Sequence, residues 1–81
     1  MSVKQQVKSY IEEFITYGDP IDDDTSLLES GMVDSTGAME MVLFLEETFD
    51  ITINDKDVDP ENLDTVNLIT TFVESKQKEA A

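Results

Sequence analysis

Apolar residues recur at helical spacing near the start of the chain. Over residues 2–17 they stand three or four positions apart, which is the period of an amphipathic helix. Ser2 and Gln5 have the spacing of a capping box at the helix start. Gly18 and Pro20 predict the helix end. The apolar positions of this predicted helix are Val3, Val7, Tyr10, Ile11, Phe14 and Ile15.

The strongest helical pattern covers about residues 35–50. Its outer face mixes acidic residues with Leu43 and Phe44, and this mixture has two interpretations. Either Leu43 or Phe44 packs against the first or last helix, or the face is a docking patch with an apolar centre and an acidic rim. The opposite side carries a narrow apolar stripe of Ala38, Val42, Leu45 and Phe49.

Shorter patterns follow this segment. Residues 51–53 alternate like a strand, but without a partner they predict extended chain. Asp59 and Pro60 are typical of the N-cap and first position of a single helical turn. Asp64 is the predicted N-cap of a last helix over about 65–77. The inward residues of that helix are Val66, Ile69, Phe72 and Val73.

The connection over residues 19–34 is long and begins with acidic residues. Asp22, Asp23 and Asp24 are too closely spaced for a defined metal site and predict a solvated run of charge. A connection of this length in a small domain must be packed, functional or both. The whole pattern predicts an all-α fold: a small helical bundle of three main helices and one short helix, with a long loop after the first helix.

Length and charge narrow the possible functions. The 81 residues suffice for a single domain over 1–81, with a frayed tail expected over about 79–81. The 19 acidic and 5 basic residues give a net charge of −14. This charge excludes nucleic acid and anionic membranes as partners, and it favours basic protein surfaces. No apolar run is long enough to insert in a membrane, so the expected location is the cytoplasm.

The residue inventory excludes several kinds of chemistry. Without Cys or His the chain has no disulfide, no Cys/His zinc site and no Cys–His catalytic pair. Asp55, Asp57 and Asp59 match three ligand positions of a calcium-binding EF-hand loop. Pro60 and Val66, however, stand where that loop needs Gly and Glu. We therefore predict no metal site and no enzymatic activity.

Asp34 and Ser35 stand where the long loop meets the strongest predicted helix. One interpretation is that Ser35 is simply the N-cap of that helix. The other is that its hydroxyl is modified by a separate enzyme. A phosphate ester there faces unpaired backbone N–H groups and the positive end of the helix dipole.

The segment around Asp34 and Ser35 resembles the modification site of acyl carrier proteins. The resemblance covers residues 28–35 and continues through Glu40, Val42 and residues 45–51, with Gly31 three positions before Asp34. Because the flanking helices and the loop also fit, nearly the whole chain is similar to this family. The resemblance implies a free-standing carrier protein in place of an enzyme.

The same resemblance implies what Ser35 does. A phosphopantetheinyl transferase esterifies it with 4′-phosphopantetheine from coenzyme A, using magnesium, and the thiol of this arm holds an acyl or aminoacyl group as a thioester. Asp34 matches the acid that precedes the modified serine, and it either assists modification or caps the helix. Other implied partners are an adenylating ligase and acyl-transferring enzymes. A monomer is expected.

Further matches and departures refine this resemblance. Glu40, Glu46 and Glu47 match helix positions that meet basic patches on partner enzymes, and with Leu43 they form the predicted docking surface. Thr36 and Gly37 depart from fatty-acid-type members, which often have Leu and an acid there. In this respect the motif is closest to D-alanyl carrier proteins and other aminoacyl-type discrete carriers.

The acidity alone also fits a different class of protein. An unmodified acidic interaction module, or a nucleic-acid mimic, needs only the charge to occupy a basic protein surface. In that hypothesis Ser35 is an ordinary N-cap. The two hypotheses differ in one covalent event, the modification of Ser35.

Overall fold

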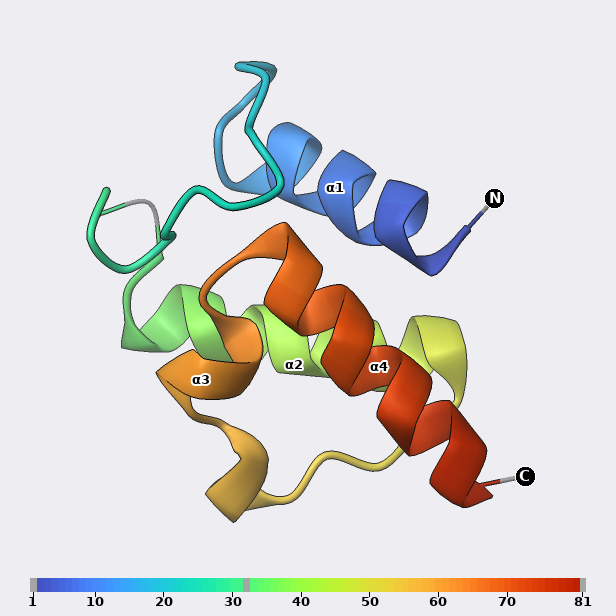
Figure 1. Ribbon diagram of the computed structural model, residues 1–81. Coiled ribbons are helices and arrows are strands. Elements are labelled where there is room, and N and C mark those ends of the chain that lie inside the picture. The colour runs from blue at the N-terminus through green and yellow to red at the C-terminus, as the bar shows by residue number, and fades with distance from the viewer. Residues whose placement is uncertain (1, 32, 81) are drawn as a thin grey trace.

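The computed structural model describes residues 2–31 and 33–80, with the side chains of Ser35 and Ala80 outside that description. Within these residues the chain is helical and contains no strand, which confirms the all-α class (Figure 1). The elements are α1 (Val3–Phe14), α2 (Ser35–Phe49), the 3-10 helix η1 (Asp55–Asp57), α3 (Pro60–Leu63) and α4 (Val66–Ala80). None of these helices is both long and apolar enough to cross a membrane.

One apolar cluster holds the helices together. α4 packs against both α1 and α3, and the long loop passes from the end of α1 to the start of α2 (Figure 1). All four residues predicted to face inward from α4 are buried. The most completely buried side chains come from α1, the loop, α2 and α4: Val7, Ile11, Leu27, Met41, Leu45, Val66, Ile69 and Val73.

The start of α1 is as predicted, but its end comes earlier. Ser2 Oγ accepts the Gln5 amide proton at 3.1 Å, and the Ser2 amide donates back to Gln5 Oε1 at 3.2 Å. The amides of Ile15 and Thr16 both donate to the carbonyl of Ile11, and this shared acceptor ends the helical ladder. Phe14 in the last turn is consequently 58% exposed, rather than buried.

The acidic run of the loop is solvated at Asp22 and Asp24, as predicted, but Asp23 and Asp24 also bind partners on other elements. Asp23 pairs with Lys4 Nζ at 2.6 Å and with Lys8 Nζ at 3.2 Å, and these two cations lower the pKa of Asp23. Asp24 accepts a hydrogen bond from Asn67 Nδ2 at 2.7 Å. The run therefore attaches the loop to α1 and α4. The sequence pattern missed this role because the partners lie far away along the chain.

The region between α2 and α3 contains one element that the sequence did not predict. The segment 51–53 is extended, as predicted, with Ile51 and Ile53 buried. The short helix η1 follows, and Asp57 in it pairs with Lys76 Nζ at 2.9 Å, which lowers the pKa of Asp57. Asp59 caps α3 as expected, because its Oδ1 accepts the Glu61 amide proton at 2.8 Å.

The predicted N-cap of α4 is wrong. Thr65 Oγ1, rather than Asp64, accepts the capping bond from the Leu68 amide, at 3.0 Å. Asp64 closes the end of α3 instead, because its amide donates to the carbonyl of Pro60 at 3.1 Å. At its other end α4 reaches Ala80, beyond the predicted residue 77. The frayed tail and the single-domain boundary remain predictions.

Leu43 and Phe44 lie on the outer face of α2 but differ in their contacts. The Phe44 ring stacks on Tyr10 of α1, with centroids 4.1 Å apart, and the Phe49 ring lies edge-on to it at 6.3 Å. Leu43 has no such partner and is 56% exposed. The packing interpretation therefore holds for Phe44, while Leu43 stays on the outer surface.

These neighbouring residues give a matched test of the packing. Phe44→Ala removes the ring stack on Tyr10, and we expect it to lower the free energy of unfolding by about 1–3 kcal/mol. Leu43→Ala leaves a solvated position and changes it by less than about 0.5 kcal/mol. Urea unfolding followed by circular dichroism measures both, and equal losses for the two variants would contradict this account.

Candidate functional site

The helix cap at the loop–helix junction is Asp34. Its backbone is extended, and its Oδ1 accepts the Gly37 amide proton at 2.8 Å. α2 begins one residue later, so Ser35 is the first helical residue, and the interpretation of Ser35 as the N-cap is wrong. A carboxylate caps well here because its charge also complements the positive end of the helix dipole.

The backbone at Ser35 has consequences for chemistry at that residue. Ser35 lies in the first turn of α2, where amide protons have no partner within the helix. A phosphate group attached to this turn is stabilised by these N–H groups and by the dipole. The Ser35 hydroxyl itself lies outside the described atoms. Asp34 therefore supplies the cap without requiring any bond from Ser35.

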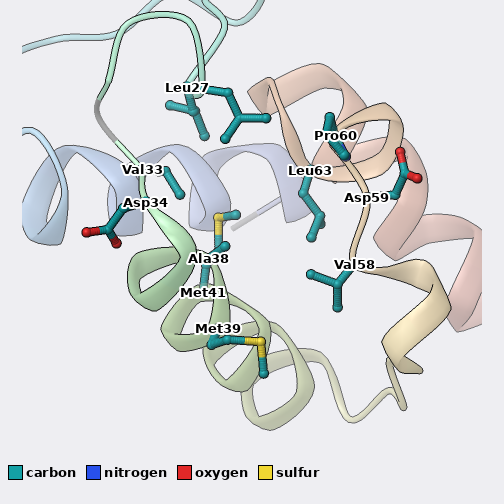
Figure 2. A pocket seen from close by; sticks show the side chains of 11 residues that line it. Leu27, Val33, Asp34, Ala38, Met39, Met41, Val58, Asp59, Pro60 and Leu63 are labelled. Atoms are coloured by element: carbon teal, nitrogen blue, oxygen red, sulfur yellow. The ribbon is translucent and has the colours of Figure 1, made fainter.

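A pocket of about 480 Å³ lies beside this junction (Figure 2). Three segments that are distant in sequence surround it: the end of the long loop, the first turns of α2, and α3 with the residue before its cap. Figure 2 shows Asp34 and Asp59 at two sides of the pocket, among apolar side chains. The apolar lining residues are Leu27, Leu28, Val33, Ala38, Met39, Met41, Val58, Pro60 and Leu63.

Sequence reasoning did not find this pocket. Its residues have the spacing of ordinary core positions, and Leu27, Met41 and Leu63 are indeed buried. Only two of its apolar residues, Leu28 (46% exposed) and Met39 (50% exposed), are large side chains left open to solvent. The sequence therefore contains only a weak indication of the pocket, because apolar residues that line a pocket have the same spacing as apolar residues that face a core.

The predicted docking residues separate into two groups. Glu40, Leu43 and Glu47 are all exposed, at helical spacing along α2. Glu46 is half-buried, and its Oε2 accepts the Ile53 amide proton at 2.9 Å. Its carboxylate therefore holds the extended segment after α2. Glu40 also acts on a neighbouring helix. Burial is the larger cause that raises the pKa of the Tyr10 hydroxyl, and the negative charge of Glu40 is the smaller one.

The described residues contain no group of three or more acidic side chains arranged to hold a metal ion. Asp57 and Asp59, two of the acids in the EF-hand comparison, are engaged in an ion pair and a helix cap.

The structure is a small acidic helical bundle with a serine in the first turn of its second helix, which is the arrangement that the resemblance to carrier proteins implies. Comparison with known proteins agrees with this class. The family model described as "Phosphopantetheine attachment site" matches residues 5–73. This chain therefore belongs to the phosphopantetheine-binding carrier protein family, whose members carry covalently attached 4′-phosphopantetheine.

Individual relatives match over nearly their whole length. The D-alanyl carrier protein of Lactobacillus acidophilus is 32% identical over 81 residues, covering 98% of this chain and 100% of the relative. The D-alanyl carrier protein of Lactococcus lactis subsp. cremoris is 32% identical over 78 residues, covering 95% and 99%. The acyl carrier protein of Chlamydia caviae is 31% identical over 78 residues, also covering 95% and 99%.

Gly37 and Gly31 provide a matched test of the backbone around the site. A Cβ at Gly37 meets Asp34 Oδ1 at 3.4 Å, an ordinary contact, so we expect Gly37→Ala to raise the free energy of unfolding by up to about 1 kcal/mol. Gly31 has a φ of +75°, so Gly31→Ala should lower it by about 1 kcal/mol. Thermal unfolding measures the stability of both variants. A change of the same sign in the two variants would contradict the backbone conformations described for Gly31 and Gly37.

Proposed function

We propose that Ser35 is the residue to which 4′-phosphopantetheine is attached, and that the thiol of this arm carries an acyl or aminoacyl group as a thioester. The observation that carries the proposal is the cap of α2. Because Asp34 provides it, Ser35 occupies the first turn, at the positive end of the α2 dipole and beside an apolar pocket. The family match over residues 5–73 supports the same assignment.

The attachment step joins the Ser35 oxygen to the β-phosphorus of coenzyme A. The bond from this phosphorus to the bridging oxygen breaks, adenosine 3′,5′-bisphosphate leaves, and the serine proton passes to a base of the transferase. This chain contributes the nucleophile and the field of the α2 N-terminus, which favours the resulting phosphodiester. Asp34 keeps the first turn of α2 in place through its bond to the Gly37 amide.

Partner enzymes supply the remaining chemistry of the cycle. They are a phosphopantetheinyl transferase, an adenylating ligase that forms the thioester, and enzymes that remove the cargo. The chain itself is not an enzyme, and we place it in the cytoplasm as a monomer. Since some relatives are D-alanyl carrier proteins, an aminoacyl cargo agrees with the Thr36 and Gly37 pattern. The family match favours this function over an unmodified acidic interaction module.

We also propose a docking surface that consists of Glu40, Leu43 and Glu47. These side chains are exposed on α2, and a net charge of −14 favours partners with basic patches. Leu43 supplies an apolar centre between the two acids. Glu46 belongs to the originally predicted surface, but its bond to the Ile53 amide gives it a structural role.

The attachment site is tested by intact mass. Wild-type protein incubated with coenzyme A, magnesium and a broad-specificity phosphopantetheinyl transferase should gain one phosphopantetheine. Ser35→Ala should gain none while keeping its far-UV circular dichroism, because the helix cap is on Asp34. Thr36→Ala, which removes the neighbouring hydroxyl, should be modified like wild type. An adduct on folded Ser35→Ala, or its absence from wild type, would refute the assignment.

The docking surface is tested by charge reversal. Glu40→Lys and Glu47→Lys should each lower the kcat/KM of modification by about threefold to tenfold at low salt, with a smaller effect at high salt. Glu74→Lys makes the same reversal at an exposed position of α4 and is the matched control. Equal losses in all three variants would show that only net charge matters, and would remove the docking surface.

A further inference from the structure

Asp64 connects two walls of the pocket beside Ser35. Its carboxylate accepts a hydrogen bond from Ser26 Oγ, at 2.9 Å to Oδ1 and 2.8 Å to Oδ2, and the Leu28 amide donates to Oδ1 at 3.0 Å. Its backbone carbonyl accepts the Leu27 amide proton at 2.8 Å. One residue at the end of α3 thus holds three consecutive residues of the long loop. We call these bonds the Asp64 junction.

The Asp64 junction spans the pocket. On the loop side, Leu27 and Leu28 line the pocket, and on the α3 side Pro60 and Leu63 do so. Leu63 immediately precedes Asp64 in the sequence. Figure 2 shows Leu27 and Leu63 on neighbouring walls of the pocket. The bonds of the junction therefore fix the distance between these two walls.

Among the described residues, the Asp64 carboxylate neither caps α4 nor forms an ion pair. Thr65 provides the cap of α4, so Asp64 is not needed there. The ion pairs of the described residues involve Lys4, Lys8 and Lys76, and none of them includes Asp64. Asp64 is half-buried, and the hydrogen-bond partners of its carboxylate among the described residues are an N–H and an O–H donor of the loop. Hydrogen bonds to a charged acceptor are stronger than those between neutral groups.

The loop bonds continue from the Asp64 junction toward the modified residue. The amide of Leu27 donates to Asp64, and the carbonyl of Leu27 in turn accepts the Val33 amide proton at 3.3 Å. Val33 is buried and precedes Asp34, the cap of α2. The position of Asp34 and of the first turn of α2 is therefore linked to Asp64 through two backbone hydrogen bonds.

We propose that Asp64 is a positioning residue for the modification of Ser35. It fixes the loop so that the junction of Asp34 and Ser35 is presented in one conformation, and it closes the loop side of the pocket. Without the Asp64 junction, the transferase has to order the loop on binding, which lowers the rate. This role rests on the proposed attachment at Ser35 and extends it to a residue 29 positions away in sequence.

Three variants test the role of Asp64. Asp64→Ala removes the side-chain bonds to Ser26 and Leu28, so that only the backbone bond to Leu27 is left of the Asp64 junction. Asp64→Asn keeps an oxygen for the Leu28 amide, and its NH₂ group can donate to Ser26 Oγ, so it is the conservative rescue. Asp22→Ala removes the same charge from an exposed loop position and is the control. Each protein is studied at full length, first by hydrogen exchange and then by the kinetics of modification.

Hydrogen exchange measures the Asp64 junction itself. In Asp64→Ala the Leu28 amide should exchange at least about tenfold faster than in wild type, relative to the Val73 amide in the core of α4. Asp64→Asn and Asp22→Ala should stay within about twofold of wild type. If Leu28 exchange does not change in folded Asp64→Ala, the junction does not hold the loop and the proposal is wrong.

Modification kinetics separate positioning from a merely structural role. The kcat/KM for phosphopantetheine transfer should fall about tenfold in Asp64→Ala and recover in Asp64→Asn. Faster Leu28 exchange with wild-type kinetics would overturn positioning while leaving the proposed function intact. Failure to modify wild type at all would instead overturn the proposed function. Should Asp64→Ala not fold, Ser26→Ala removes the Oγ contacts with the Asp64 carboxylate and the bond from the Glu29 amide, while the Asp64 side chain stays in place. Wild-type exchange and kinetics in that variant would refute the proposal.

Discussion

The attachment of the long loop by acidic side chains is the constraint on which the site depends. Where the structure describes the loop, its backbone forms turns rather than a helix or a strand, and the loop has to bring Asp34 to the start of α2. Asp23 joins it to α1, Asp24 joins it to α4, and Asp64 joins it to the end of α3. A protein with few cations therefore uses its excess of carboxylates as hydrogen-bond acceptors, which offsets part of their mutual repulsion.

At the start of α2, helix capping and the proposed modification fall on two different residues. A serine that capped its own helix would have its hydroxyl engaged in the cap and would lose that cap on modification. Here the cap is one residue earlier, on Asp34, and the first turn remains hydrogen-bonded whatever is attached to Ser35. With the proposed attachment at Ser35, the cap of α2 therefore does not depend on whether the arm is present.

The outer face of α2 shows a comparable separation between side chains that pack and side chains that stay exposed. Phe44 and Glu46 both turn toward the protein, one stacking on Tyr10 and the other accepting the Ile53 amide proton. Glu40, Leu43 and Glu47 remain on the surface. Residues next to each other in sequence thus serve different purposes, because successive positions of a helix point about 100° apart.

The sequence by itself determined the helices, most of their ends and the carrier resemblance, because these follow from local period, capping residues and a short motif such as Asp34-Ser35. It left open which of Asp34 and Ser35 is the cap, and it assigned Asp64 to the wrong helix end. Only the tertiary structure decided these points, the pocket and the bonds of Asp23. The pocket and the side-chain bonds of Asp23 and Asp64 depend on partners that are distant in the chain, and local patterns carry no information about such partners. The cap of α2 is a local contact with Gly37, but Asp34 and Ser35 are both good capping residues, so the pattern alone does not choose between them.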